Sequence, residues 1–123
     1  MYIEVLIPTY KKTKAEIIEL FKKLNIKSDA VFANQCGFEK EEIFNIENHT
    51  IKLISSNTVG VSKNRNILSH YASGDINICI DDDCPLVDNY VEIITTFFKK
   101  HNDAECALFN GIWKTHNNKP VHR

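Results

Sequence analysis

Strand-like and helix-like segments alternate along the whole of this 123-residue chain, and no other feature restricts its fold as much. Residues 2–8 are an almost continuous apolar run, which is typical of a strand buried on both faces. Pro8 is expected to close this strand, because proline cannot donate to a central ladder. Thr13 and Glu16 then have the spacing of a capping box, so a helix follows. Repeated units of this kind predict an α/β domain with an open, mostly parallel sheet and flanking helices.

The later strands are predicted from shorter apolar runs. They cover residues 29–34, 50–55, 76–80 and 104–110. The acidic stretch 38–48 has only a weak pattern and predicts a loop or a single helical turn.

Each predicted helix has one apolar face and signals at its ends. Ser62 is expected to cap the second helix, and Gly74 has the position of a glycine that follows a helix C-terminus. Pro85 is expected to begin the third helix. The three apolar faces hold Ile17, Leu20, Phe21 and Leu24, then Ile67, Leu68, Tyr71 and Ala72, and then Tyr90, Val91, Ile94, Phe97 and Phe98.

Bulk properties narrow the cellular setting. The formal net charge is −1 and no basic run stands out, so a nucleic-acid partner is not expected. No stretch reaches the roughly 18 apolar residues that span a bilayer, and the N-terminus has no signal-peptide pattern. The four cysteines lack C-x-x-C spacing, which favours a reducing cytoplasm.

Polar side chains follow three of the predicted strands. In an open parallel sheet, ligands bind outside the carboxyl ends of the strands, where the strand order reverses. Groups far apart in the sequence are therefore expected to meet in one crevice. These groups are Thr9 and Tyr10, then Asn34 and Gln35, and then Asp81, Asp82 and Asp83.

The aspartate triplet is the sharpest of these features. Adjacent carboxylates repel one another, so a fold that holds them together usually supplies a cation. In an extended segment Asp81 and Asp83 would point one way and Asp82 the other. Two such oxygen ligands suit Mg²⁺ or Mn²⁺. The alternative is an exposed acidic turn that caps the helix at Pro85, but the position directly after a buried strand favours the metal.

Arg65 is a second candidate. It lies in the first turn of the helix that follows Gly60, near the ligand end of the sheet. A guanidinium beside free helix N–H groups suits a phosphate or a nucleobase. The alternative is a solvated helix surface, which is also what we expect for Lys63.

Four segments together resemble a known family. They are residues 5–10, 33–36, 60–66 and 76–83, in the order and approximate spacing of the N-terminal portion of family 2 glycosyltransferases, especially bacterial capsular and exopolysaccharide enzymes. The resemblance implies the GT-A fold, whose sheet is Rossmann-like, and it implies that residues 1–123 are a nucleotide-sugar-binding portion.

The resemblance also implies roles for the candidate residues. Asn34 and Gln35 lie where many members have an aspartate that touches the base, so the choice of base is left open. Thr9 and Tyr10 would hold the uridine, Arg65 would lie near the base and phosphates, Asp81 or Asp82 near the ribose, and Asp83 with Asp81 on Mn²⁺ or Mg²⁺.

The implied activity is the transfer of a sugar from a nucleotide-sugar donor, first of all a UDP-sugar, to a saccharide or lipid-linked acceptor in polysaccharide synthesis. A cytoplasmic enzyme at the inner face of the membrane is expected, and homo-oligomers and peripheral membrane association are compatible with the sequence. Family members carry the general base in a second half, well beyond the aspartate strand. No residue here matches that base, so the chain alone is expected to be inactive.

Two alternatives remain at this level. A sugar-1-phosphate nucleotidylyltransferase shares the sheet plan, but it usually needs a glycine-rich basic loop after the first strand, and residues 8–13 contain no glycine. A non-catalytic α/β module that binds a partner chain would bind no nucleotide.

Overall fold

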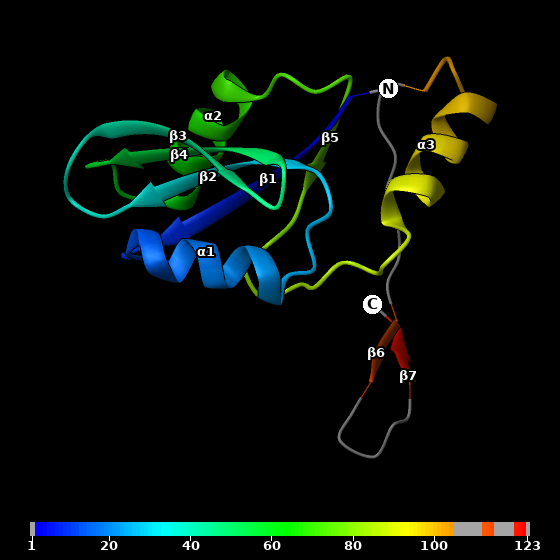
Figure 1. The fold of residues 1–123 in the computed structure, drawn as a ribbon, viewed down its shortest axis with the longest axis horizontal. Coiled ribbons are helices and arrows are strands. Elements are labelled where there is room, and N and C mark those ends of the chain that lie inside the picture. Colours follow the sequence, from blue (N-terminus) through cyan, green and yellow to red (C-terminus); the bar gives the residue numbers. More distant parts are fainter. Residues whose placement is uncertain (1, 105–111, 115–119, 123) are drawn as a thin grey trace.

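The computed structural model describes residues 2–104, 112–114 and 120–122, and its main body is a five-stranded sheet with helices on both faces (Figure 1). A separate antiparallel pair consists of β6 (Ile112–Lys114) and β7 (Pro120–His122). The main elements are β1 (Ile3–Tyr10), α1 (Lys14–Lys23), β2 (Asp29–Gln35), β3 (Lys40–Ile46), β4 (His49–Ser56), α2 (Val61–Tyr71), β5 (Ile76–Cys79) and α3 (Tyr90–Lys100).

The sheet has the strand order β3-β4-β2-β1-β5. β1 pairs in parallel with β2 and with β5, and β2 pairs in parallel with β4. Only β3 runs antiparallel, against β4. The predicted α/β fold with a mostly parallel sheet is therefore confirmed.

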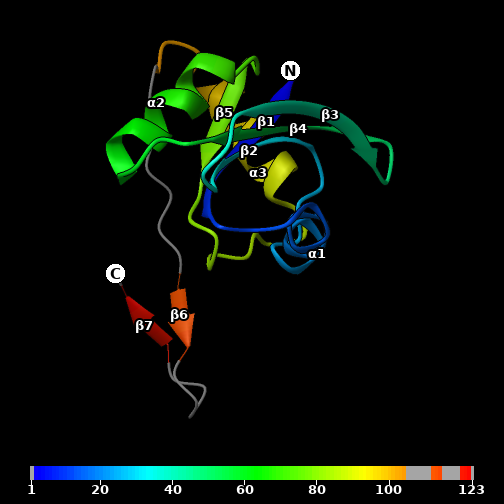
Figure 2. The same ribbon diagram turned by 90° about the vertical axis from the view of Figure 1, so that its left-hand side faces the viewer.

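Apolar side chains on the two faces of the sheet form two separate cores. Val5 and Ile7 of β1 belong to one core, whereas Leu6 between them belongs to the other. α1 and α3 cover the first face and α2 covers the second (Figure 2). Burial on both faces explains why the first strand is a continuous apolar run.

The predicted helix faces agree with this packing. Leu20, Ile67, Tyr71, Ala72, Val91 and Phe98 are partly buried against the cores. The buried members of the predicted faces are Ile17, Phe21, Leu24, Leu68, Tyr90 and Ile94.

No helix in the described part of the chain is both long and apolar enough to cross a membrane.

The start of α1 confirms the predicted capping box. The Thr13 hydroxyl accepts a hydrogen bond from the backbone N–H of Glu16 at 3.2 Å, and the Glu16 carboxylate accepts one from the backbone N–H of Thr13 at 3.0 Å. Two of the N–H groups that a helix start leaves without partners are thereby satisfied.

The prediction that Pro8 closes the first strand was wrong. β1 continues to Tyr10, and Pro8 lies opposite Ala33 of β2. Along a strand, the backbone groups of every second residue point to the same neighbouring strand. The Leu6 carbonyl accepts a hydrogen bond from the Ile80 N–H on the side of β5, so the Pro8 nitrogen points to that side as well. The pairing with β5 ends there, and the missing N–H costs no ladder bond.

The prediction of a loop or a helical turn over residues 38–48 was also wrong. This stretch contains β3, which forms a hairpin with β4 through Glu47 and Asn48. Both turn residues have positive φ, 51° and 69°, as a two-residue type I′ turn requires. Exposed and more buried side chains alternate along β3 as far as Ile46. The many exposed charged residues of this edge strand hide that alternation in the sequence.

Two helix starts differ from the prediction. Gly60, at φ 102°, is the N-cap of α2, and its carbonyl accepts from the Asn64 N–H, so Ser62 lies inside the first turn. α3 begins at Tyr90 rather than at Pro85. Its preceding segment is held against the end of α1, because the Leu86 N–H donates to the Leu24 carbonyl at 2.9 Å.

The remaining expectations concern shorter segments. The strand predicted over 104–110 falls outside the described residues, apart from Ala104. Gly74 does not act as a helix-ending glycine, because α2 already ends with Ala72 as its C-cap. Gly74 instead lies in a tight approach to the backbone of β1 and β5.

Glu4 holds the segment around Gly74 against the sheet, at the edge opposite to the polar strand ends. Its side chain is almost completely buried, with 1% exposed. One carboxylate oxygen accepts from the Ser73 N–H at 2.7 Å, and the other lies 3.4 Å from the Lys52 ammonium. The buried charge is thus paired and hydrogen-bonded, as burial demands.

We predict that Gly74→Ala destabilises the fold. The added Cβ would lie 2.7 Å from the Ile76 carbonyl oxygen and 3.0 Å from the Glu4 nitrogen, so the backbone has to move. The free energy of unfolding, measured by urea denaturation, should fall by about 1–3 kcal/mol. The exposed helix residue Asn66 provides the control, because Asn66→Ala should change it by less than about 0.5 kcal/mol. An unchanged midpoint for Gly74→Ala would contradict the packing.

Candidate functional site

A cleft of about 490 Å³ lies at the carboxyl edge of the sheet, where β1 adjoins the chain that follows β5. This is the point at which the strand order reverses, because α1 and α2 cover opposite faces. Seven of the eight predicted site residues line it, and Asn34 is the exception. The lining residues are Pro8, Thr9, Tyr10, Gln35, Gly60, Val61, Asn64, Arg65, Asp81, Asp82 and Asp83.

Asn34 lies beneath the cleft with only 2% of its surface exposed. Its Oδ1 accepts hydrogen bonds from the Thr9 hydroxyl at 2.9 Å and from the Lys12 N–H at 3.1 Å, and its Nδ2 donates to the Lys12 carbonyl at 2.7 Å. These bonds hold the chain after β1 against β2. The contact of Asn34 with a nucleotide stays a prediction.

Gln35 connects the end of β2 to the loop before α2. Its Nε2 donates to the Thr58 hydroxyl at 3.2 Å and to the Gly60 carbonyl at 2.8 Å. Both amide hydrogens are therefore engaged, and Oε1 is the polar atom of this side chain that remains available.

Asn64 lines the cleft but was not singled out from the sequence. It is 3% exposed, and its Nδ2 donates to the carbonyls of Ala33 and Thr9 at 2.8 and 3.4 Å. Its Oδ1 is buried without a hydrogen-bond partner among the described residues. The available signal was the helical spacing, because Asn64 lies one turn before Leu68 and thus falls on the buried face.

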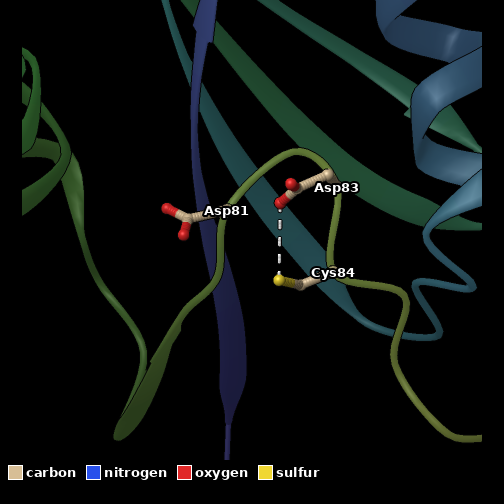
Figure 3. A group of neighbouring side chains, drawn as sticks. All are labelled: Asp81, Asp83 and Cys84. Atoms are coloured by element: carbon tan, nitrogen blue, oxygen red, sulfur yellow. Dashed lines mark hydrogen bonds between the residues drawn. The ribbon is translucent and has the colours of Figure 1, made fainter. Parts of the chain in front are cut away.

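The three aspartates form a turn rather than an extended segment (Figure 3). The Cys84 N–H donates to the Asp81 carbonyl at 3.3 Å and closes this turn. The strict alternation expected for an extended chain therefore does not apply. The turn nevertheless gathers Asp81 and Asp83, whose carboxylate oxygens and the Cys84 sulfur all lie within 4.8 Å of one another.

Arg65 of α2 reaches the same turn. Its Nη2 lies 4.0 Å from Asp81 Oδ1, and both side chains are about two-thirds exposed, at 66% and 64%. Such an exposed pair contributes little to stability. The guanidinium is therefore free to take part in other contacts at the cleft.

Comparison with known proteins assigns the family. The family model for glycosyl transferase family 2 matches residues 4–123, which include every strand and helix that builds the cleft. The chain belongs to glycosyl transferase family 2. No curated protein and no solved structure matches it. Membership supports glycosyltransferase activity with a nucleotide-sugar donor and an acceptor, in general terms.

The acidic turn fits a divalent cation by its donor chemistry. Burial raises the pKa of the Cys84 thiol, and its hydrogen bond to Asp83 and the nearby carboxylate charges raise it further. Mg²⁺ and Mn²⁺ prefer oxygen to sulfur ligands, so Asp81 and Asp83, rather than the Cys84 thiol, are the suitable donors. The alternative of an exposed acidic turn that caps the next helix is wrong in its second part, because the N-cap of α3 is Asn89. The turn itself is exposed, since all three aspartates are exposed.

We predict that Asp83→Asn speeds the alkylation of Cys84. The substitution removes the charge and the carboxylate acceptor that favour the neutral thiol, so the pKa of Cys84 should fall and its thiolate fraction at pH 8 should rise. Iodoacetamide labelling followed by mass spectrometry should show a rate increase on the order of threefold.

Asp82→Asn is the matched control for this experiment. It makes the same charge change in the same turn, but Asp82 is not among the groups that shift the pKa of Cys84. An equal acceleration by both variants would contradict a specific effect of Asp83 on the pKa of the thiol.

Proposed function

We propose that this chain binds a nucleoside-diphosphate sugar, first of all a UDP-sugar, with Mn²⁺ or Mg²⁺. The sugar would go to a saccharide or lipid-linked acceptor in polysaccharide synthesis at the cytoplasmic face of the membrane. One observation carries this proposal: a single cleft brings together Arg65, two neighbouring carboxylates and the polar ends of β1 and β2. Family membership supports the same class of donor.

The charged groups suggest how the donor would lie in the cleft. Arg65, Asp81 and Asp83 make the end that suits a diphosphate, because a guanidinium binds phosphate oxygens and the carboxylates suit a cation. A bound cation would neutralise diphosphate charge and so favour its departure. Thr9, Tyr10 and Gln35, at the carboxyl ends of β1 and β2, would hold the nucleoside, and Asp82 would lie near the ribose.

Transfer of the sugar also requires a general base. The acceptor hydroxyl attacks the anomeric carbon, the bond to the diphosphate breaks, and the hydroxyl proton passes to a carboxylate. The carboxylates that line the cleft are Asp81, Asp82 and Asp83. Our proposal already assigns these to the cation and the ribose, so it leaves the base outside the cleft residues described above.

Calorimetric titration with UDP tests the donor site. We expect binding that strengthens at least about tenfold when Mn²⁺ is present, because the ion offsets charge repulsion between the diphosphate and the carboxylates. Asp83→Ala should remove the Mn²⁺ dependence. Asp103→Ala removes an exposed carboxylate after α3 and Lys63→Ala an exposed cation of α2, and neither should alter it. Absence of heat with every nucleoside diphosphate would refute the proposal.

A second experiment separates binding from transfer. A sample that binds UDP should give no measurable transfer of labelled sugar from a UDP-sugar to saccharide acceptors, because the cleft supplies no unassigned base. The calorimetric signal of the same sample shows that it is folded and competent to bind. Robust transfer would mean that one of the three aspartates, or another residue of this chain, acts as the base.

A further inference from the structure

We propose that a groove between α2 and β5 holds the apolar part of an amphiphilic acceptor, a saccharide that is attached to an aliphatic chain. This inference rests on the proposed function, because it concerns the second substrate of the same transfer. It gives that substrate a binding site beside the donor cleft and narrows the class of acceptor.

The groove is a second cavity, of about 420 Å³, on the face of the sheet that α2 covers. Leu6 of β1 packs in the core beneath α2, and in the parallel register it lies opposite Cys79 of β5. Neighbours in register point to the same face of a sheet, so Cys79 also points to the side of α2. Leu6 is buried whereas Cys79 is exposed. The helix therefore leaves the β5 side of this face uncovered, and the groove lies there.

The lining of the groove is apolar apart from one serine and one charged pair. Leu6 and Leu68 line it together with Cys79, whose thiol behaves as a small hydrophobe. The charged residues of the lining are Arg65 and Asp81, 4.0 Å apart, and both also line the donor cleft. The two cavities therefore adjoin at this pair. A ligand that complements the groove is apolar within it and polar at the junction with the cleft.

The position of the junction identifies such a ligand as an acceptor. Arg65 and Asp81 are groups that our proposal assigns to the diphosphate and the cation. The bond that breaks in the transfer joins the sugar to this diphosphate, so an acceptor hydroxyl held at the junction lies near the reacting carbon. A free saccharide would leave the apolar lining in contact with water, whereas an attached chain would bury it. The groove therefore favours a lipid-linked over a free saccharide.

Protection of Cys79 from alkylation tests the groove. The probes are methyl, hexyl and octyl glucoside below their critical micelle concentrations, and iodoacetamide labelling is followed by mass spectrometry. Each CH₂ group that enters the groove should strengthen binding about fourfold. Hexyl and octyl glucoside should therefore slow the labelling of Cys79 at concentrations at least about tenfold lower than methyl glucoside. Cys36 follows β2 outside the groove, and its labelling rate should not change.

Protein variants then assign the protection to the groove. Ser69 is an exposed residue of α2 that lines the groove, so Ser69→Trp should fill it and abolish the protection of Cys79. His70→Trp adds the same side chain at an exposed position of the same helix that lines neither cavity, and it should leave the protection intact. Both variants should bind UDP with Mn²⁺ like the unaltered protein. Circular dichroism checks their fold, and the chain-length series tests the groove on the unaltered protein if Ser69→Trp does not fold.

The outcomes separate this inference from the proposed function. Equal slowing at Cys36, equal protection by methyl and octyl glucoside, or protection that survives Ser69→Trp would overturn the groove while the donor site stands. Displacement of octyl glucoside by UDP with Mn²⁺ would overturn its role as the acceptor site, because donor and acceptor must be bound together. Absence of UDP binding would remove the donor site, and the acceptor role with it.

Discussion

The parallel register of β1 and β2 is the constraint on which the site depends. Thr9 lies opposite Asn34 and Tyr10 opposite Gln35, so the last two residues of both strands reach the same edge of the sheet. β5 pairs with the first half of β1 only, and the chain beyond it is released beside that edge as the aspartate turn. A slip of one residue would turn these side chains to the other face. Burial of β1 on both faces holds the register, since a slipped strand would misplace an apolar residue on either side.

The cleft floor is polar although it is buried, and this combination has a cost. Thr9, Asn34 and Asn64 are each less than 5% exposed, at 4%, 2% and 3%. Their mutual bonds and their bonds to backbone carbonyls offset most of the desolvation that burial imposes. A network of this kind fixes one arrangement of side chains more strictly than an apolar floor would. The open acceptor of Asn64 is the exception within it.

Much of this arrangement was predictable, because it follows from the spacing of apolar residues and from the positions at which the strands end. The parallel sheet, the capping box and the convergence of Thr9, Gln35, Arg65 and the aspartates required only patterns within single segments. The errors arose where distant residues decide. Pro8 is tolerated because β5 stops short, α3 starts late because Leu86 bonds to Leu24, and β3 exists because β4 offers it an edge. Asn64 was missed because a polar residue on a buried helix face gives no pattern of its own.

The two hydrogen bonds that the Gln35 amide donates affect the free-energy cost of ligand binding. A mobile loop must lose conformational freedom when it closes on a ligand, and that loss weakens the complex. Here the loop before α2, at Thr58 and Gly60, is already joined to the end of β2 by a single amide group. This loop is thereby preorganised, and a ligand that binds against it has less ordering to impose there.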